Sequence, residues 1–153
     1  MAGFIEFPGP IVFKKIELLK EDTLALWGTM TAQHMLEHLL LPLKFSRGVF
    51  EVPVVTPLDK LEKTKRIMLL SDAPFKRDFQ APFIGPGLQA LKYKSLDESK
   101  LALFKEIEAF LFYWKENPNS IFAHPIFGSL NEKEWYLFHS KHFTHHLSQF
   151  GLV

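Results

Sequence analysis

Cysteine is absent from this chain of 153 residues. Its absence excludes disulfide bonds, thiolate metal ligands and a cysteine nucleophile, so a metal site would have to use histidine, aspartate or glutamate. An excess of charge is lacking too, because 18 basic side chains stand against 17 acidic ones and the net charge is +1. Since binding to phosphate backbones depends on a basic surface, we expect no nucleic-acid partner.

Long hydrophobic runs are also missing. The longest, from Leu39 to Leu43, is far too short to cross a bilayer. The first residues lack the basic and apolar regions of a signal peptide, so we expect a cytoplasmic protein with no membrane partner. Hydrophobic residues make up 47% of the chain, which is ample for one core, and the sequence predicts a single domain over residues 1–153.

The clearest pattern that is present is the helical spacing of apolar residues. The predicted helices are one that follows Pro10, one over 31–41 that Pro42 ends, a short one near 58–70, one over 95–116, and one that begins at the N-cap Asn131 and ends at Gly151. No alternating strand pattern is longer than a few residues. The predicted fold class is therefore all-α, a four-helix bundle with a long crossover over 42–95.

In the last helix, histidines interrupt the apolar stripe where a core would favour leucine. An imidazole buried without a partner costs roughly 1–3 kcal/mol, so several on one stripe indicate that they bind something. A divalent metal is the most economical partner, because His142 and His146, at i and i+4, direct their rings to a common point. One helix supplies at most two or three ligands, and His38, which lies among leucines on the 31–41 helix, is the candidate for another.

Two segments carry a resemblance to a known family. Residues 27–39 (WGTMTAQHMLEHL) and 127–147 (FGSLNEKEWYLFHSKHFTHHL) resemble the DinB/YfiT-like superfamily, and within it a branch of unknown function. The resemblance implies a four-helix bundle that holds one divalent metal through a histidine of the second helix and an i, i+4 histidine pair of the fourth. In this sequence those positions fall on His38, His142 and His146.

The resemblance also implies a class of activity. Relatives include metal-dependent hydrolases and transferases or isomerases that use low-molecular-weight thiols, so we expect a small-molecule substrate or thiol. Three imidazole ligands leave open coordination positions, as in catalytic zinc or nickel sites. The alternative is a non-catalytic helical module that binds a metal or another ligand. Because the 42–95 crossover departs from better-studied members, their substrates cannot be assigned to this chain. A homodimer is left open.

The remaining histidines have less defined expectations. His139, one turn before His142, is a candidate fourth ligand, second-shell group or general base, and His34, one turn before His38, is a weaker candidate of the same kind. His145 points about 100° away from its neighbour, so we expect it to face solvent or a partner. His124, which precedes a proline, is expected to be a loop histidine.

Glu37 belongs to a second pattern in the same segment. Residues 34–38 read H-x-x-E-H, the signature of the inverzincin metalloproteases, in which the glutamate activates water. A loose pattern of five residues arises easily by chance, and a protease would leave the histidines of the last helix unexplained. We therefore expect Glu37 to lie on a solvated helix face.

Overall fold

The computed structural model describes residues 3–77, 79 and 87–153. In chain order its elements are α1 (Pro10–Glu17), α2 (Ala32–Phe45), α3 (Leu58–Thr64), the π-helical turn η1 (Lys65–Leu69), α4 (Leu96–Glu116), β1 (Phe122–His124), β2 (Gly128–Leu130) and α5 (Glu132–Gln149). Within these ranges, no helix combines the length and the apolar character that a membrane span requires.

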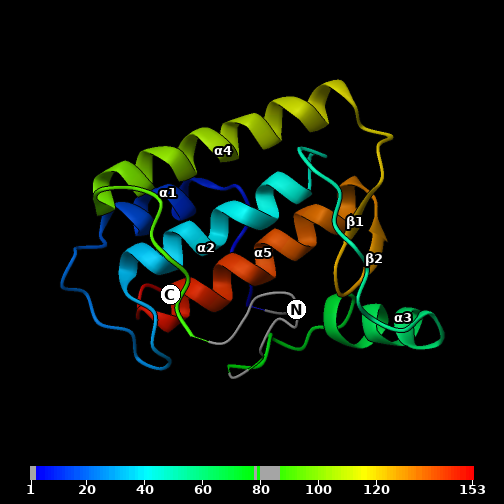
Figure 1. Ribbon diagram of the computed structural model, residues 1–153, viewed down its shortest axis with the longest axis horizontal. Coiled ribbons are helices and arrows are strands. Elements are labelled where there is room, and N and C mark those ends of the chain that lie inside the picture. The colour runs from blue at the N-terminus through cyan, green and yellow to red at the C-terminus, as the bar shows by residue number, and fades with distance from the viewer. Residues whose placement is uncertain (1–2, 78, 80–86) are drawn as a thin grey trace.

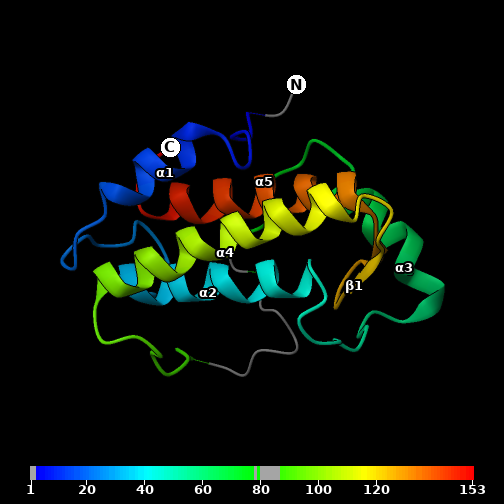
Figure 2. The same cartoon turned by 90° about the horizontal axis from the view of Figure 1, so that it is seen from above.

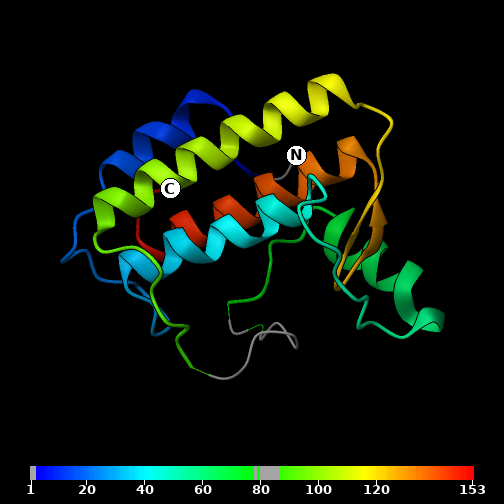
Figure 3. The ribbon, with the colours of Figure 1, turned by 45° about the horizontal axis from the view of Figure 1, so that its top comes forward.

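Helices α1, α2, α4 and α5 pack around one core (Figure 1). Helix α4 crosses over α2 and α5, as the view from above shows (Figure 2), and α1 lies beside α4 and α5. The β-hairpin and α3 lie together at the opposite end of the molecule from the start of α2 (Figure 3). The histidine-bearing helices α2 and α5 are therefore neighbours along the middle of the molecule.

The predicted all-α four-helix bundle is wrong. Besides five helices, the described residues form a two-stranded antiparallel sheet, in which Phe122 pairs with Leu130 and His124 with Gly128. Each strand has three residues, which is too short for the period-2 alternation that identifies a strand in a sequence. Gly128 begins β2 with φ of +73°, a conformation that glycine adopts without strain.

Local hydrogen bonds fix where the long helices begin. The side chains of Thr31, Ser95 and Asn131 accept from backbone N–H groups three residues ahead, at the starts of α2, α4 and α5. Asn131 also forms a capping box with Glu134. Because these caps set the first residue of each helix, they also set which side chains face the core.

The prediction that Pro42 ends the second helix is wrong, because α2 continues to Phe45. Proline has no N–H to donate to the carbonyl of His38, so one helical hydrogen bond is lost. Downstream the helical turn continues, with Ser46 N donating to the carbonyl of Pro42 over 3.0 Å. Leu43 and Phe45 are buried, and this burial favours the extra turn over a break at the proline.

Candidate metal centre

Three imidazoles from two helices meet in the interior. His38 comes from α2, and His142 and His146 come from α5. The Nε2 atoms of His38 and His142 are 3.1 Å apart, and one ligand nitrogen from each of the three rings lies within 4.8 Å of the others. The ring centroids are 4.7 to 5.1 Å apart. The structure therefore brings together the three residues that the sequence predicted as ligands, and we call them the histidine triad.

The tautomer of His146 follows from a chain of hydrogen bonds. The carbonyl of Trp27 accepts from Gln149 Nε2 over 3.1 Å, which fixes the orientation of this amide. Gln149 Oε1 then lies 2.9 Å from Nδ1 of His146 and can only accept, so the imidazole proton is on Nδ1. The lone pair of Nε2 is therefore left free, and the ring of His146 lies 4.7 Å from that of His38.

His142 packs against an aromatic side chain of its own helix. Its ring stacks on Phe138 with a centroid distance of 5.0 Å, and its Nδ1 is a buried atom with no partner among the described residues. Because Nε2 is the nitrogen that faces His38, a proton on Nδ1 is the tautomer that directs a lone pair to the centre of the triad.

The three rings are neutral at pH 7. Burial lowers the pKa of His38 to about 4, with a further contribution from His145. Burial also lowers the pKa values of His142 and His146 well below the usual 6.5, and the neighbouring imidazoles add to both shifts. Neutral imidazole is the form that binds a metal ion, so the surroundings hold the triad in the ligand state.

His139 lies in the core behind the triad. Its ring is fully buried against Phe7, Phe110 and Trp135, with centroids 4.9 to 5.7 Å away. Its Nε2 is 2.9 Å from the hydroxyl of Ser46. His139 is not among the residues that line the cavity described below, so the structure places it behind the triad rather than at its open side.

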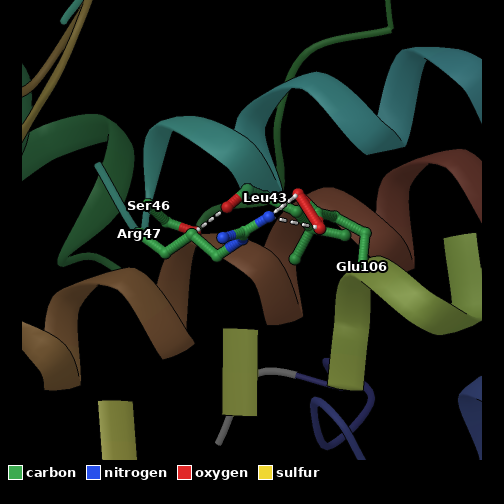
Figure 4. Close-up of polar contacts among 4 residues, drawn as sticks. All are labelled: Leu43, Ser46, Arg47 and Glu106. Atoms are coloured by element: carbon green, nitrogen blue, oxygen red, sulfur yellow. Dashed lines mark hydrogen bonds and ion pairs between the residues drawn. The ribbon is translucent and has the colours of Figure 1, made fainter. Parts of the chain in front are cut away.

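Figure 4 shows how the end of α2 holds Ser46 in place. The hydroxyl of Ser46 donates to the carbonyl of Leu43 over 2.8 Å, so this hydroxyl accepts the proton that His139 carries on Nε2. The next residue, Arg47, forms a bidentate ion pair with Glu106 of α4 at 3.0 to 3.1 Å. This pair ties α2 to α4 and fixes the hydroxyl on which the His139 tautomer depends.

A cavity of about 690 Å³ lies beside the triad and is lined by all three of its rings. Apolar side chains from several elements form much of its wall, among them Met30, Leu41, Met68, Phe75, Ile126 and Phe127. His34 lies on the same wall, with Nδ1 2.6 Å from the Thr31 hydroxyl. The triad is therefore reachable by a small molecule from one side and closed by the core on the other.

Two residues differ from their expected surroundings. Glu37 is not on a solvated face: its carboxylate accepts from Lys92 N at 2.6 Å, from Gln33 Nε2 at 2.9 Å and from Ser99 Oγ at 3.3 Å. It therefore fastens the segment before α4 to α2. His145 is half-buried beside Phe75 and lines the cavity, because the segment that contains Phe75 covers this side of α5.

His124 is a residue of the site that was expected to lie in a loop. The residue ends β1, is 5% exposed and lines the cavity. The hairpin places it there by pairing its strand with the residues just before α5. The only sequence signal was its position before proline and four residues before Gly128, which is typical of a tight turn.

Comparison with known proteins gives a family of unknown function. Residues 88–151 match the model of a family described as a protein of unknown function (DUF1569). The matched segment covers α4, the hairpin and α5, and so includes two members of the triad, His142 and His146. No curated protein and no solved structure matches the chain. These comparisons supply no activity and give no support to the resemblance to the DinB/YfiT-like superfamily.

Proposed function

We propose that this chain is a metal-dependent enzyme related to the DinB/YfiT-like proteins, with one divalent transition-metal ion held by His38, His142 and His146. The observation that carries the proposal is the convergence of three imidazoles, those of His142 and His146 buried and that of His38 half-buried, whose ligand nitrogens lie within 4.8 Å of one another and whose pKa values are lowered by burial. Imidazole ligands favour zinc, nickel or copper over magnesium or calcium, and zinc or nickel is our first choice.

The residues fit such an ion in two further respects. Zinc–nitrogen bonds of about 2.0–2.1 Å with tetrahedral angles put ligand nitrogens about 3.3 Å apart. The Nε2 atoms of His38 and His142 are already at 3.1 Å. Gln149 supplies the outer contact that metal-bound histidines usually make, because it accepts the Nδ1 proton of His146 and leaves Nε2 for the ion.

The position of the cavity favours a catalytic ion over a purely structural one. Structural zinc sites are closed by four protein ligands, whereas this triad provides three and faces a cavity of about 690 Å³. A bound ion supplies Lewis acidity to a substrate atom that reaches it. The substrate would be a small molecule, and hydrolysis of an ester or amide and transfer of a low-molecular-weight thiol are the two reactions we favour.

We assign His139 a supporting role in this enzyme. A general base must reach the substrate, whereas the Nε2 proton of His139 is directed to Ser46 and the ring is enclosed by aromatic side chains. From behind the triad, His139 orients α5 against α2 at the level of His142.

One observation favours a second candidate, a binding module without turnover. Among the described residues that line the cavity, Glu37 is the one carboxylate, and its oxygens already accept several hydrogen bonds. No free carboxylate in this lining is available to act as a general base. The two candidates share the metal and the cavity, so they differ in turnover rather than in binding.

Metal titration tests the shared part of the proposal. Wild-type protein freed of metal by a chelator should bind about one zinc or nickel ion, measured by calorimetry and elemental analysis. Single replacements of His38, His142 or His146 by alanine should each weaken binding by a factor of about 100 or more, because two imidazoles remain. His145→Ala is the matched control and should bind within about threefold of wild type. Equal losses in all four variants, or no uptake by wild type, would exclude the site.

Cobalt substitution separates the enzyme from the module. An ion with an open position accepts an added ligand, so the visible spectrum of the cobalt-loaded protein should change on addition of a thiol or a hydroxamate. Turnover in panels of esters, amides and thiol acceptors would then support the enzyme. A spectral change without any turnover would favour the binding module.

A further inference from the structure

The hairpin fixes the tautomer of His124. The backbone N–H groups of Ile126 and Phe127 both point to its Nδ1, at 3.0 and 3.4 Å. A nitrogen that accepts hydrogen bonds keeps its lone pair, so the proton of the neutral ring is on Nε2. The ring stays neutral because burial lowers its pKa to about 3. His124 therefore presents one N–H donor whose position is set by the turn.

This donor has no acceptor among the residues that the structure describes. None of the described residues pairs with Nε2 of His124. The described polar atoms that are both sealed from solvent and unpaired are four others, on Trp27, Trp135, His139 and His142. His124 lines the cavity and its Nε2 is not among these sealed atoms, so the cavity is where this N–H can meet an acceptor. A donor in such a place is satisfied by whatever occupies the cavity.

The donor and the histidine triad share one wall. The ring of Phe138 lies 4.5 Å from that of His124 and stacks at 5.0 Å on that of His142. On its other side, His124 stacks on Phe127 at 4.7 Å. These aromatic contacts hold the imidazole in one orientation. A small ligand that reaches the triad therefore passes beside the His124 donor.

The charges around the cavity favour an anion. Four cationic side chains line it, and none of them has an ion-pair partner among the described residues: Lys44, Lys76, Arg77 and Lys92. Arg77 lies 4.1 Å above the ring of Trp27, which holds the guanidinium near the cavity. The one lining carboxylate, on Glu37, is already engaged in hydrogen bonds. Apolar side chains form much of the remaining wall.

We propose that the cavity binds a carboxylate ligand with an apolar body and that His124 Nε2–H donates to one of its carboxylate oxygens. His124 is then a ligand-binding residue in addition to the triad. The proposal rests on the proposed function in that the ligand is the molecule brought beside the metal. Its parts are a fixed donor, cations without an ion-pair partner in the described ranges, and an apolar wall around a single cavity.

Two replacements distinguish the role of His124 as a hydrogen-bond donor to a ligand from its role as an acceptor in the turn. In His124→Asn, the side-chain oxygen can accept from the N–H of Ile126, as in an Asx turn, but no donor reaches the cavity. In His124→Gln, the longer amide can place an N–H group near the former Nε2, but nothing replaces the Nδ1 acceptor. A residue that serves only the turn would be replaced better by asparagine, and a ligand-binding donor better by glutamine.

The experiment is a calorimetric titration with octanoate of wild type and both variants, each in metal-free and zinc-loaded form. We expect His124→Asn to keep a melting temperature near that of wild type and to bind octanoate at least about tenfold more weakly, because a hydrogen bond to a charged oxygen is lost. His124→Gln should bind octanoate with an affinity within about threefold of wild type, measured at a temperature below the melting temperature of this variant. In wild type labelled with nitrogen-15, octanoate should shift the Nε2–H resonance of His124 downfield.

The outcomes also separate this proposal from that of the metal site. Binding of octanoate that depends on the His124 donor in a protein that takes up no zinc would support the ligand site and reject the metal. Zinc uptake together with equal octanoate affinity in wild type and His124→Asn would overturn the ligand site and leave the metal intact. The ligand site is equally overturned if wild type does not bind octanoate or if the Nε2–H resonance does not move.

Discussion

Mild acid should unfold the metal-free protein. Its buried histidines, His38 and His124 among them, are neutral when folded, and burial lowers the pKa of these two to about 4 and about 3. The unfolded chain has a histidine pKa of about 6.5. Below pH 6.5 protons therefore bind the unfolded state first, and stability that is complete above this pH is lost as the pH falls towards the folded pKa values.

The size of the effect follows from proton linkage. Between pH 7.5 and pH 5.0, a histidine with an unfolded pKa of about 6.5 and a folded pKa below 5 removes about 2 kcal/mol from the free energy of unfolding. His38 and His124 together remove about 4 kcal/mol. The pKa values of His139, His142 and His146 are lowered well below 6.5 by burial and act in the same direction. The total free energy of unfolding of a typical domain is only about 5–15 kcal/mol.

Urea denaturation followed by circular dichroism at pH 7.5, 6.5, 5.5 and 5.0 measures this loss, with a chelator present throughout. The matched control is His124→Asn, which should lose about 2 kcal/mol less than wild type over the same range, because one titrating group is gone. Added zinc should stabilise wild type at pH 7.5 and do so much less at pH 5.0, since the ligands must be neutral. A free energy of unfolding that stays constant from pH 7.5 to pH 5.0 would refute the neutral buried histidines.

Two further predictions concern the supports of the site. Gln149→Leu should weaken zinc binding by about 10–100-fold although all three ligands remain. Gln149→Glu keeps an acceptor for His146, so its zinc affinity should stay within about threefold of wild type. Equal zinc affinities of Gln149→Leu and wild type in calorimetry would contradict the role of this amide. Arg47→Met should lower the free energy of unfolding by about 2–3 kcal/mol, because it leaves the 6% exposed Glu106 without its cation. The double variant with Glu106→Leu should recover most of that loss in urea denaturation, and a larger loss in the double variant would argue against the explanation.

Features that depend on neighbouring residues could be predicted from the sequence. Thr31 and Asn131 cap their helices through hydrogen bonds to residues three positions ahead, so the cap can be recognised in the sequence itself. Helical spacing then places His142 and His146 on one face, and the structure brings both next to His38. Whether the triad holds a metal stays a prediction.

Features that depend on distant residues could not be predicted in this way. Glu37 was assigned to solvent because its partners, Lys92 and Ser99, are 55 and 62 residues further along the chain. The hairpin was missed because three-residue strands carry no periodicity, and with it the burial of His124. The class of fold was therefore wrong in the region where the hairpin builds part of the cavity wall. The two helices that carry the triad were predicted, although α2 continues past Pro42 to Phe45.

Lys141 connects α5 to the segment at the end of η1 through three hydrogen bonds. It is 1% exposed, and its ammonium group donates to the carbonyls of Met68, Leu69 and Ser71 at 2.7 to 3.3 Å. An ammonium group has three hydrogens, so these three acceptors saturate it. The residue next to His142 thus fastens the end of η1, and with it the segment that leads to Phe75, to the histidine-bearing helix. If a ligand at the triad displaced α5, these three hydrogen bonds of Lys141 would move the segment from Met68 to Phe75 with it.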